Sequence, residues 1–109
     1  MGLFGSRKKF EKNVTRDNKF LKDYAVKVNS LLFYTEENEK VTKELNAMKD
    51  DFEFSVASSD PKVKPLEKKI HKDFDLLKST LQQGGWDEAE VTMMIRGIRA
   101  TIIEIASQR

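Results

Sequence analysis

The sequence contains no cysteine, and this absence removes several kinds of site at once. Without a thiol the chain forms no disulfide, no thiolate metal site and no cysteine nucleophile. His71 is the only histidine, which leaves too few ligands for a zinc or copper site of the ordinary type. We therefore expect no metal ion and no other cofactor. A cysteine-free chain of this size is compatible with a cytoplasmic location.

Glycine, proline and long apolar runs are also scarce. Five glycines and two prolines among 109 residues are too few for the many turns of a β-sandwich or barrel. No run approaches the roughly 20 apolar residues that a membrane-spanning helix needs. Residues 1–10 lack the apolar segment of a secretory signal. These absences favour an all-α protein that does not cross a membrane.

The sequence carries no catalytic motif. The spacing of the glycines matches no phosphate-binding loop. Acidic clusters at residues 36–39, 50–53 and 87–90 lack the pattern of a calcium-binding loop, and we interpret them as solvated helix faces and first helical turns. His71 and Asp75 are four residues apart and could pair on a helix surface, but acid–base catalysis also needs a cleft. We expect no enzymatic activity and no small-molecule substrate.

What the sequence does contain is apolar residues at steps of three and four, the period of an amphipathic helix. Such stripes cover residues 20–32, 41–56, 66–81 and 91–105. The last two have heptad-like spacing, which predicts coiled-coil-like packing. The fourth stripe is the most apolar, so we expect its helix to be the most buried. A composition of 39% hydrophobic and 35% charged residues suits a bundle of such helices.

The clearest break between helices is at residues 58–61. Asp60 can cap a helix that has Pro61 at its first position. Pro65 lacks the amide hydrogen that a helix interior requires, so regular helix is expected to begin there. Gly84 and Gly85 end the third helix, because glycine readily takes the left-handed conformation of a helix C-cap.

The fourth helix has the best-marked start. Asp87 is the expected N-cap, and Glu90 stands three residues later in a capping-box arrangement. Trp86 and Val91 have the spacing of a hydrophobic staple. The acidic residues Asp87, Glu88 and Glu90 would repel phosphates from the start of this helix. We therefore disfavour a helix-turn-helix interpretation and expect no nucleic-acid partner.

Gly97 lies inside this fourth helix, where it costs about 1 kcal/mol relative to alanine. With Thr101 one turn later, it could form a shallow groove for close approach of another helix. That helix could belong to the same chain or to a second protein.

Two arrangements of the first two stripes remain open. The wholly polar residues 35–40 predict a break, with Thr35 as N-cap and Glu36 and Glu37 in the first turn of the next helix. The break gives an antiparallel bundle of four helices of near-equal length. The lack of glycine and proline between Ser6 and Asp60 instead favours one helix of about 40 residues, in a three-helix chain completed by homodimerisation. The capping signal inclines us towards the break.

Charge is distributed unevenly along the chain. Residues 1–30 hold eight basic against three acidic residues, and residues 36–60 hold three against eight. We divide the chain into a flexible basic tail, residues 1–15, and a single bundle domain, residues 16–109. The first six residues fit the M-G-x-x-x-[ST] myristoylation pattern, and basic residues follow, as stable anchoring to anionic lipid requires. The expected membrane-contact residues are Gly2, Leu3, Phe4, Arg7, Lys8, Lys9, Phe10 and Lys12.

Four aromatic residues within fifteen positions exceed what one helix seam normally buries. Phe20, Tyr24, Phe33 and Tyr34 are therefore the expected partner-binding residues. The resulting hypothesis is a non-enzymatic interaction or scaffold module that binds a protein partner or a second copy of itself. The alternative is a peripheral membrane protein attached to an anionic surface by its N-terminus. We expect a cytoplasmic location, with membrane association in the alternative case.

Overall fold

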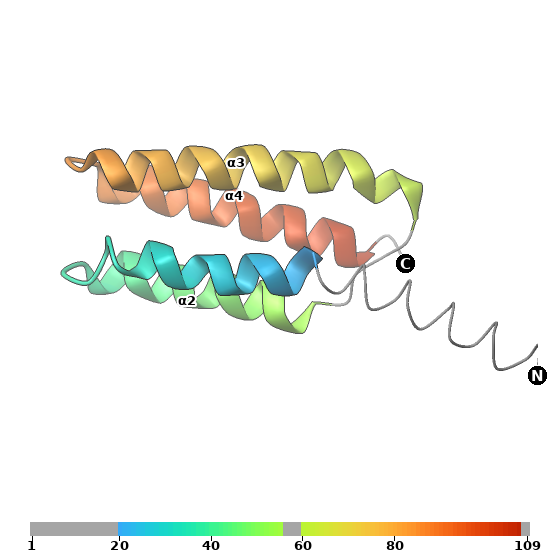
Figure 1. The fold of residues 1–109 in the computed structure, drawn as a ribbon, viewed down its shortest axis with the longest axis horizontal. Helices are drawn as coiled ribbons and strands as arrows, with labels where there is room; N and C mark the ends of the chain where they lie inside the picture. The colour runs from blue at the N-terminus through green and yellow to red at the C-terminus, as the bar shows by residue number, and fades with distance from the viewer. Residues whose placement is uncertain (1–19, 56–59, 108–109) are drawn as a thin grey trace, which may run out of the picture.

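The computed structural model describes residues 20–55 and 60–107, and all of their regular secondary structure is helical. The first helix covers residues 20–32 of the described chain. It is followed by α2 (Glu39–Phe54), the short 3₁₀ helix η1 (Pro61–Val63), α3 (Lys64–Gln83) and α4 (Glu88–Ser107). The predicted tail, residues 1–15, lies outside the described residues. The prediction of a four-helix bundle is confirmed (Figure 1).

Each helix contributes the apolar stripe that its sequence predicts. The buried apolar positions of α2, α3 and α4 follow steps of three and four. Helix α4 has seven buried residues, Thr92 and Thr101 among them, against four each on α2 and α3. These side chains form one continuous core, and fully burying each large aliphatic one contributes about 1.5–3 kcal/mol. The fully buried side chains of this core with the largest volume include Phe52, Leu21, Leu31, Leu45, Met48, Ile70, Leu77, Ile95, Ile98 and Ile102.

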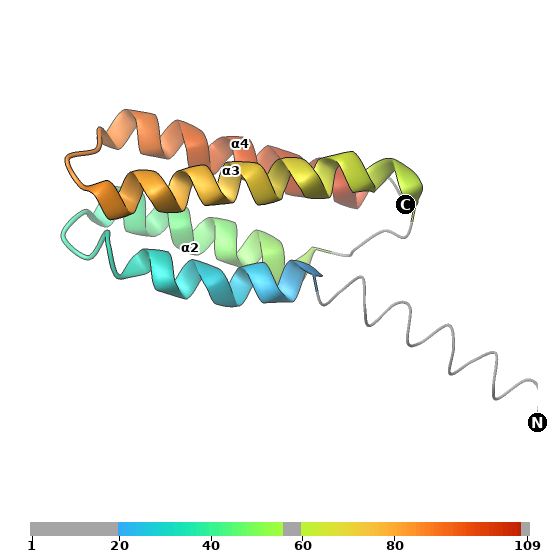
Figure 2. The same cartoon turned by 45° about the horizontal axis from the view of Figure 1, so that its top comes forward.

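Consecutive helices run antiparallel, but the four do not follow one another around the bundle. Figures 1 and 2 show the first helix and α2 as one layer, with α3 and α4 as the other. Helix α4 packs against both α2 and α3. The first helix contacts α2 through Tyr24 and Phe52 and contacts α3 through Tyr24 and Phe74. Helices α2 and α3 therefore occupy opposite corners, and α2 lies parallel to its neighbour α4.

Charged side chains hold the parallel α2–α4 pair together. Arg99 Nε donates to Asp51 Oδ2 at 2.6 Å, and Arg99 Nη1 lies 3.5 Å from Glu44 Oε2. Arg96 Nη2 lies 3.2 Å from Glu44 Oε1. The hydrogen bond from Arg99 to Asp51 is the main cause that raises the pKa of this guanidinium. Because Arg99, Asp51 and Glu44 are all partly buried, the contacts of Arg99 are stronger than surface ion pairs.

The chain turns near Thr35, as the polar gap predicts, but the expected cap is wrong. Asn38 is the N-cap of α2, and its Oδ1 accepts the Val41 amide at 3.0 Å. The first turn of that helix therefore contains Glu39. Thr35 is buried and belongs to the turn itself. Both residue types are good N-caps, and burial of Thr35 decides between them.

The other predicted boundaries are close to those in the structure. Asp60 caps η1 by accepting the Lys62 amide at 2.9 Å, and α3 begins at Lys64, one residue before Pro65. Gly84 and Gly85 end α3 with positive φ of 74° and 64°, which glycine adopts readily, although a ψ of 176° places Gly84 outside the left-handed helical region that the sequence predicts. Asp87 Oδ2 accepts the Glu90 amide at 3.3 Å at the start of α4.

Candidate functional site

The four aromatic residues predicted to bind a partner divide into two pairs. Phe33 and Tyr34 lie at the end of the first helix and are 75% and 40% exposed. Phe20 is partly buried against the core, and Tyr24 is only 3% exposed. The structure therefore leaves Phe33 and Tyr34 as the members of this set that are open to a partner.

Tyr24 belongs to the core because the first helix places it between α2 and α3. Its ring stacks on Phe52 at 5.4 Å between centroids and meets Phe74 edge-on at 5.0 Å. Its hydroxyl hydrogen bonds to His71 Nδ1. Burial, with a smaller contribution from the charge of Asp75, raises the pKa of Tyr24 above its ordinary value of 10.0. The position of Tyr24 in the stripe with Leu21 and Val28 explains its burial.

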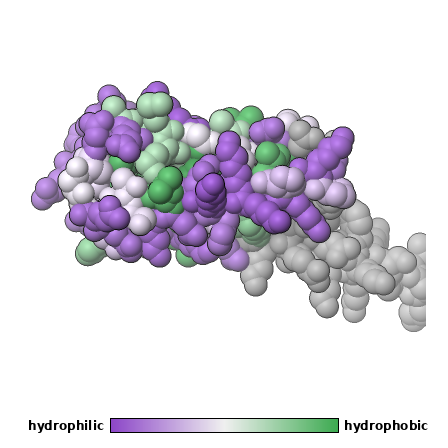
Figure 3. Space-filling view, turned by 90° about the horizontal axis from the view of Figure 1, so that it is seen from above, coloured by the Kyte–Doolittle hydropathy of each residue, from purple (hydrophilic) through white to green (hydrophobic). Residues whose placement is uncertain are grey.

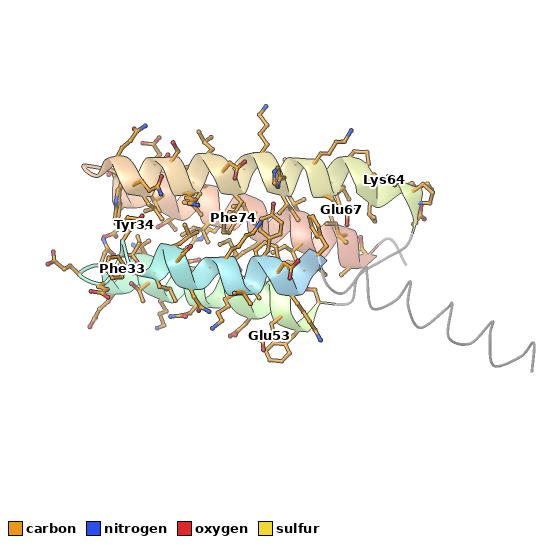
Figure 4. The ribbon with its side chains drawn as sticks, viewed as in Figure 1. Phe33, Tyr34, Glu53, Lys64, Glu67 and Phe74 are labelled. Carbon is orange, nitrogen blue, oxygen red and sulfur yellow. The ribbon has the colours of Figure 1, made fainter. Side chains whose placement is uncertain are left out.

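Phe33 and Tyr34 border a hollow at one end of the bundle, where two loops meet. One loop is residues 33–38 and the other is residues 84–87. The hollow has a volume of about 510 Å³ and is lined by residues 33–38 together with Gly85 and Trp86. Figure 4 shows Phe33 and Tyr34 at this end of the molecule. We call this region, residues 33–40 and 84–90, the loop-end surface.

Hydrogen bonds around the buried Thr35 fix the first of these loops. The Thr42 hydroxyl donates to the Thr35 carbonyl oxygen at 2.6 Å, and the two hydroxyl oxygens lie 2.9 Å apart. The backbone amide of Asn38 donates to the same carbonyl at 2.8 Å. The Phe33 and Tyr34 rings meet edge-on, with centroids 6.2 Å apart. The exposed aromatic pair thus stands on a turn whose backbone is well anchored.

Contacts between residues far apart in the sequence hold the two loops together. Asn38 Nδ2 donates to Glu88 Oε2 at 3.0 Å, and Lys40 Nζ lies 3.5 Å from Glu88 Oε1. Gln82 Nε2 donates to the Tyr34 hydroxyl at 3.3 Å. Trp86 is half-buried and packs against the core. The loop-end surface is therefore preorganised, which lowers the entropic cost of binding a partner.

The loop-end surface is strongly acidic. Its carboxylates outnumber its basic residues by six to one: the base is Lys40, and the acids are Glu36, Glu37, Glu39, Asp87, Glu88 and Glu90. The acids in α2 and α4 stand in first helical turns, where the helix dipole favours negative charge. Glu36 and Glu37 lie in the turn before α2, outside any helix, and both are exposed.

A second hollow lies near the other end of the bundle, between the first helix and α3. It has a volume of about 620 Å³, and Phe20 forms part of its wall. Basic side chains dominate its α3 side, although Glu67 and Asp75 also line it. Figure 4 shows Lys64 and Glu67 near the start of α3. The basic lining residues are Lys64, Lys68, His71 and Lys72.

The surface pair of His71 and Asp75 that their spacing allows is present. His71 Nε2 lies 3.8 Å from Asp75 Oδ2, and both side chains are mostly exposed. Among residues 20–55 and 60–107, no group of three or more potential ligands is arranged to hold a metal ion. None of the described helices combines the length and apolarity needed to cross a membrane. The predicted membrane-contact residues, from Gly2 to Lys12, lie outside the described residues.

Gly97 does not mark a close approach within the described chain. It is exposed on α4, and a Cβ built on it meets no atom within 4 Å. Other apolar side chains on α3 and α4, including Leu76, Met93 and Ile103, are exposed too. Figure 3 shows hydrophobic residues on this face as separate patches among hydrophilic ones. Apolar residues scattered singly in this way are normal on protein surfaces.

Two residues contribute to the loop-end surface in ways that local sequence patterns do not indicate. Trp86 lines the hollow in addition to its place in the hydrophobic staple, and Asn38 both caps α2 and contacts Glu88. The link from Asn38 to Glu88 joins residues fifty positions apart, so local sequence patterns carry no signal for it.

Comparisons with protein-family models, with curated proteins and with solved structures found no match in any of the three.

Proposed function

We propose that this protein is a non-enzymatic interaction module that binds a protein partner through its loop-end surface. The observation that carries the proposal is the exposure of Phe33 beside Tyr34 at the rim of the hollow. An aromatic ring left 75% exposed gains nothing from burial within its own chain. Aromatic residues set beside a hollow are typical anchors of protein interfaces.

The anchoring of the turn supports this proposal. The hydrogen bonds around Thr35 and the bond from Asn38 to Glu88 hold both sides of the hollow in place before a partner arrives. A surface that needs no reorganisation keeps more of its contact energy as affinity. Among the described residues, the other exposed phenylalanine is Phe54, which lies at the C-terminal end of α2 and lines no part of this hollow.

Site-specific photo-crosslinking in cells of the source organism tests the proposal. A photoreactive phenylalanine derivative replaces Phe33 in one variant and Phe54 in a control, because their exposures of 75% and 76% are matched. We expect a discrete crosslinked product from position 33 that a Tyr34→Ala substitution strongly reduces. Position 54 should not give that product. Identical products from both positions, or no product from position 33, would contradict the proposal.

A second candidate function is attachment to an anionic membrane surface. The observation that favours it is a row of lysines on α3 at spacings of four, Lys64, Lys68 and Lys72, beside the second hollow. They line the same hollow as Phe20, the residue at which the described chain begins. Basic side chains near a bilayer contribute about 1 kcal/mol each towards binding anionic lipid.

Liposome flotation of the full chain tests this candidate. Replacing the three lysines with glutamine should weaken binding to anionic vesicles, and added salt should weaken binding of the unaltered chain. Removing residues 1–16 separates the contribution of the N-terminal residues from that of α3. Equal flotation with neutral and anionic vesicles, or no flotation with either, would reject the candidate.

A further inference from the structure

We infer that the loop-end surface takes a cationic segment of the partner protein, rich in lysine or arginine and carrying aliphatic side chains. This inference rests on the proposed function and specifies the chemistry of the partner. Two independent features of the surface support it, its charge and its aromatic rings.

Most of the negative charge of the loop-end surface is not neutralised by basic residues of the described chain. Glu88 pairs with Lys40, the only basic residue of the surface. The other five carboxylates form no ion pair with another described residue, which leaves a net negative charge open to solvent. A field of one sign over a hollow attracts segments of the opposite sign and accelerates their association.

Glu36 and Glu37 point most directly to a partner. Acids in a first helical turn stabilise their own helix, so such residues need no partner to explain them. Glu36 and Glu37 are adjacent, exposed and outside any helix, where two like charges repel each other. They also line the hollow beside Phe33. A cation in the hollow would relieve this repulsion.

The aromatic rings suit the same kind of partner. The faces of phenylalanine, tyrosine and tryptophan attract ammonium and guanidinium groups. The aliphatic stems of lysine and arginine also pack along apolar surface such as these rings. This chain already contains one such contact, with Lys27 Nζ 4.5 Å from the centroid of the Tyr24 ring. Phe33, Tyr34 and Trp86 offer three rings around an acidic hollow. An anionic partner, such as a nucleic acid or phosphopeptide, would be repelled.

The single tryptophan of the chain provides a reporter inside this site, because Trp86 lines the hollow. The probe is a blocked octapeptide of alternating lysine and leucine, titrated into the full-length protein. Trp86 fluorescence reports occupancy, and isothermal titration calorimetry gives the dissociation constant independently. Two control ligands are an octapeptide of alternating glutamate and leucine and the polyamine spermine, which has charge without side chains that pack on a ring.

We expect saturable binding of the lysine peptide that weakens by about tenfold or more in moderate salt. The Glu36→Gln/Glu37→Gln variant should bind about tenfold more weakly, and so should Phe33→Ala. A matched control, Asp50→Asn/Glu53→Gln, removes two exposed charges from α2 and should change affinity by less than about twofold. Circular dichroism confirms that each variant is folded.

Three results would overturn the inference. They are equal binding of the two octapeptides, spermine binding as tight as that of the lysine peptide, and equal losses in the Glu36/Glu37 and Asp50/Glu53 variants. The proposed function fails separately. If crosslinking from position 33 succeeds while the lysine peptide does not bind, the surface binds a partner of other chemistry. If both fail, the loop-end surface is not a binding site.

Discussion

Replacing Gly97 with alanine should stabilise the protein, because the glycine has no packing role within the described chain. Gly97 lies within α4 and is exposed, and a Cβ built on it meets no atom within 4 Å. Glycine in a helix interior is less favourable than alanine by about 0.8–1.0 kcal/mol, mainly through backbone entropy. With no steric cost to offset this gain, we expect the free energy of unfolding to rise by about 1 kcal/mol.

Urea unfolding followed by circular dichroism measures this change. The midpoint should rise with an unchanged slope, and the melting temperature should rise by about 4–8 °C for a domain of this size. Gly84→Ala is the opposite control, because Gly84 has φ of 74° and alanine is strained there. We expect that variant to lose on the order of 1–3 kcal/mol, because its φ and ψ of 74° and 176° are essentially restricted to glycine. A loss of stability in Gly97→Ala would refute the reasoning and indicate a close contact at Gly97.

Three further changes test the bundle. Tyr24→Phe removes the hydrogen bond to His71 and should cost about 1 kcal/mol at neutral pH. Burial raises the pKa of Tyr24 in the folded protein above 10.0. The contribution of neutral Tyr24 to stability is therefore complete below pH 10.0 and is lost as the pH rises through the raised pKa. Urea unfolding at alkaline pH should therefore show a smaller further loss in the variant than in the unaltered protein, and equal losses would contradict this. Arg99→Met should cost about 1 kcal/mol, because the bond to the partly buried Asp51 is lost, whereas Arg96→Met, at a more exposed pair, should cost less than about 0.5 kcal/mol. If thermal melts showed equal losses of stability for Arg99→Met and Arg96→Met, the two α2–α4 contacts would not differ in strength as their burial implies. Asn38→Ala should cost about 1 kcal/mol through loss of the N-cap of α2, and hydrogen exchange should show faster opening of its first turn. Unchanged exchange there would argue against Asn38 as the cap.

The helices of this fold could be predicted from the sequence because each has an apolar stripe, and capping residues or glycines mark several of the helix ends. Gly84 and Gly85 end α3, and Asp87 caps α4, as their residue types indicate. The cap of α2 could not be chosen correctly, since Thr35 and Asn38 are both good caps. Burial of the Thr35 hydroxyl against Thr42 decides between them, and that contact exists only after the turn forms.

The order of helices around the bundle could not be predicted from the stripes. An apolar stripe indicates which face of a helix is buried, but it does not indicate which other helix covers that face. The parallel packing of α2 on α4 depends on contacts such as Arg99 to Asp51, between residues nearly fifty positions apart. Period and capping carry no information on such pairs.

The candidate site was predicted in part. Four clustered aromatic residues exceed what one helix seam buries, and the structure exposes two of them, Phe33 and Tyr34. Tyr24 fits the stripe with Leu21 and Val28, so the same periodicity should have assigned it to the core. The hollow forms only where Trp86 lies beside the turn at residues 33–38. These residues are distant in the sequence, so the tertiary fold is needed to bring them together.

Chemical-shift mapping tests most directly the claim that the loop-end surface is the binding surface. Amide spectra of the ¹⁵N-labelled full chain would be recorded during titration with the lysine–leucine octapeptide. We expect chemical-shift changes concentrated at residues 33–40 and 84–90, which Phe33→Ala reduces and Phe54→Ala leaves unchanged. Shifts concentrated elsewhere, for example at residues 62–72, or no shifts at any peptide concentration, would contradict the claim.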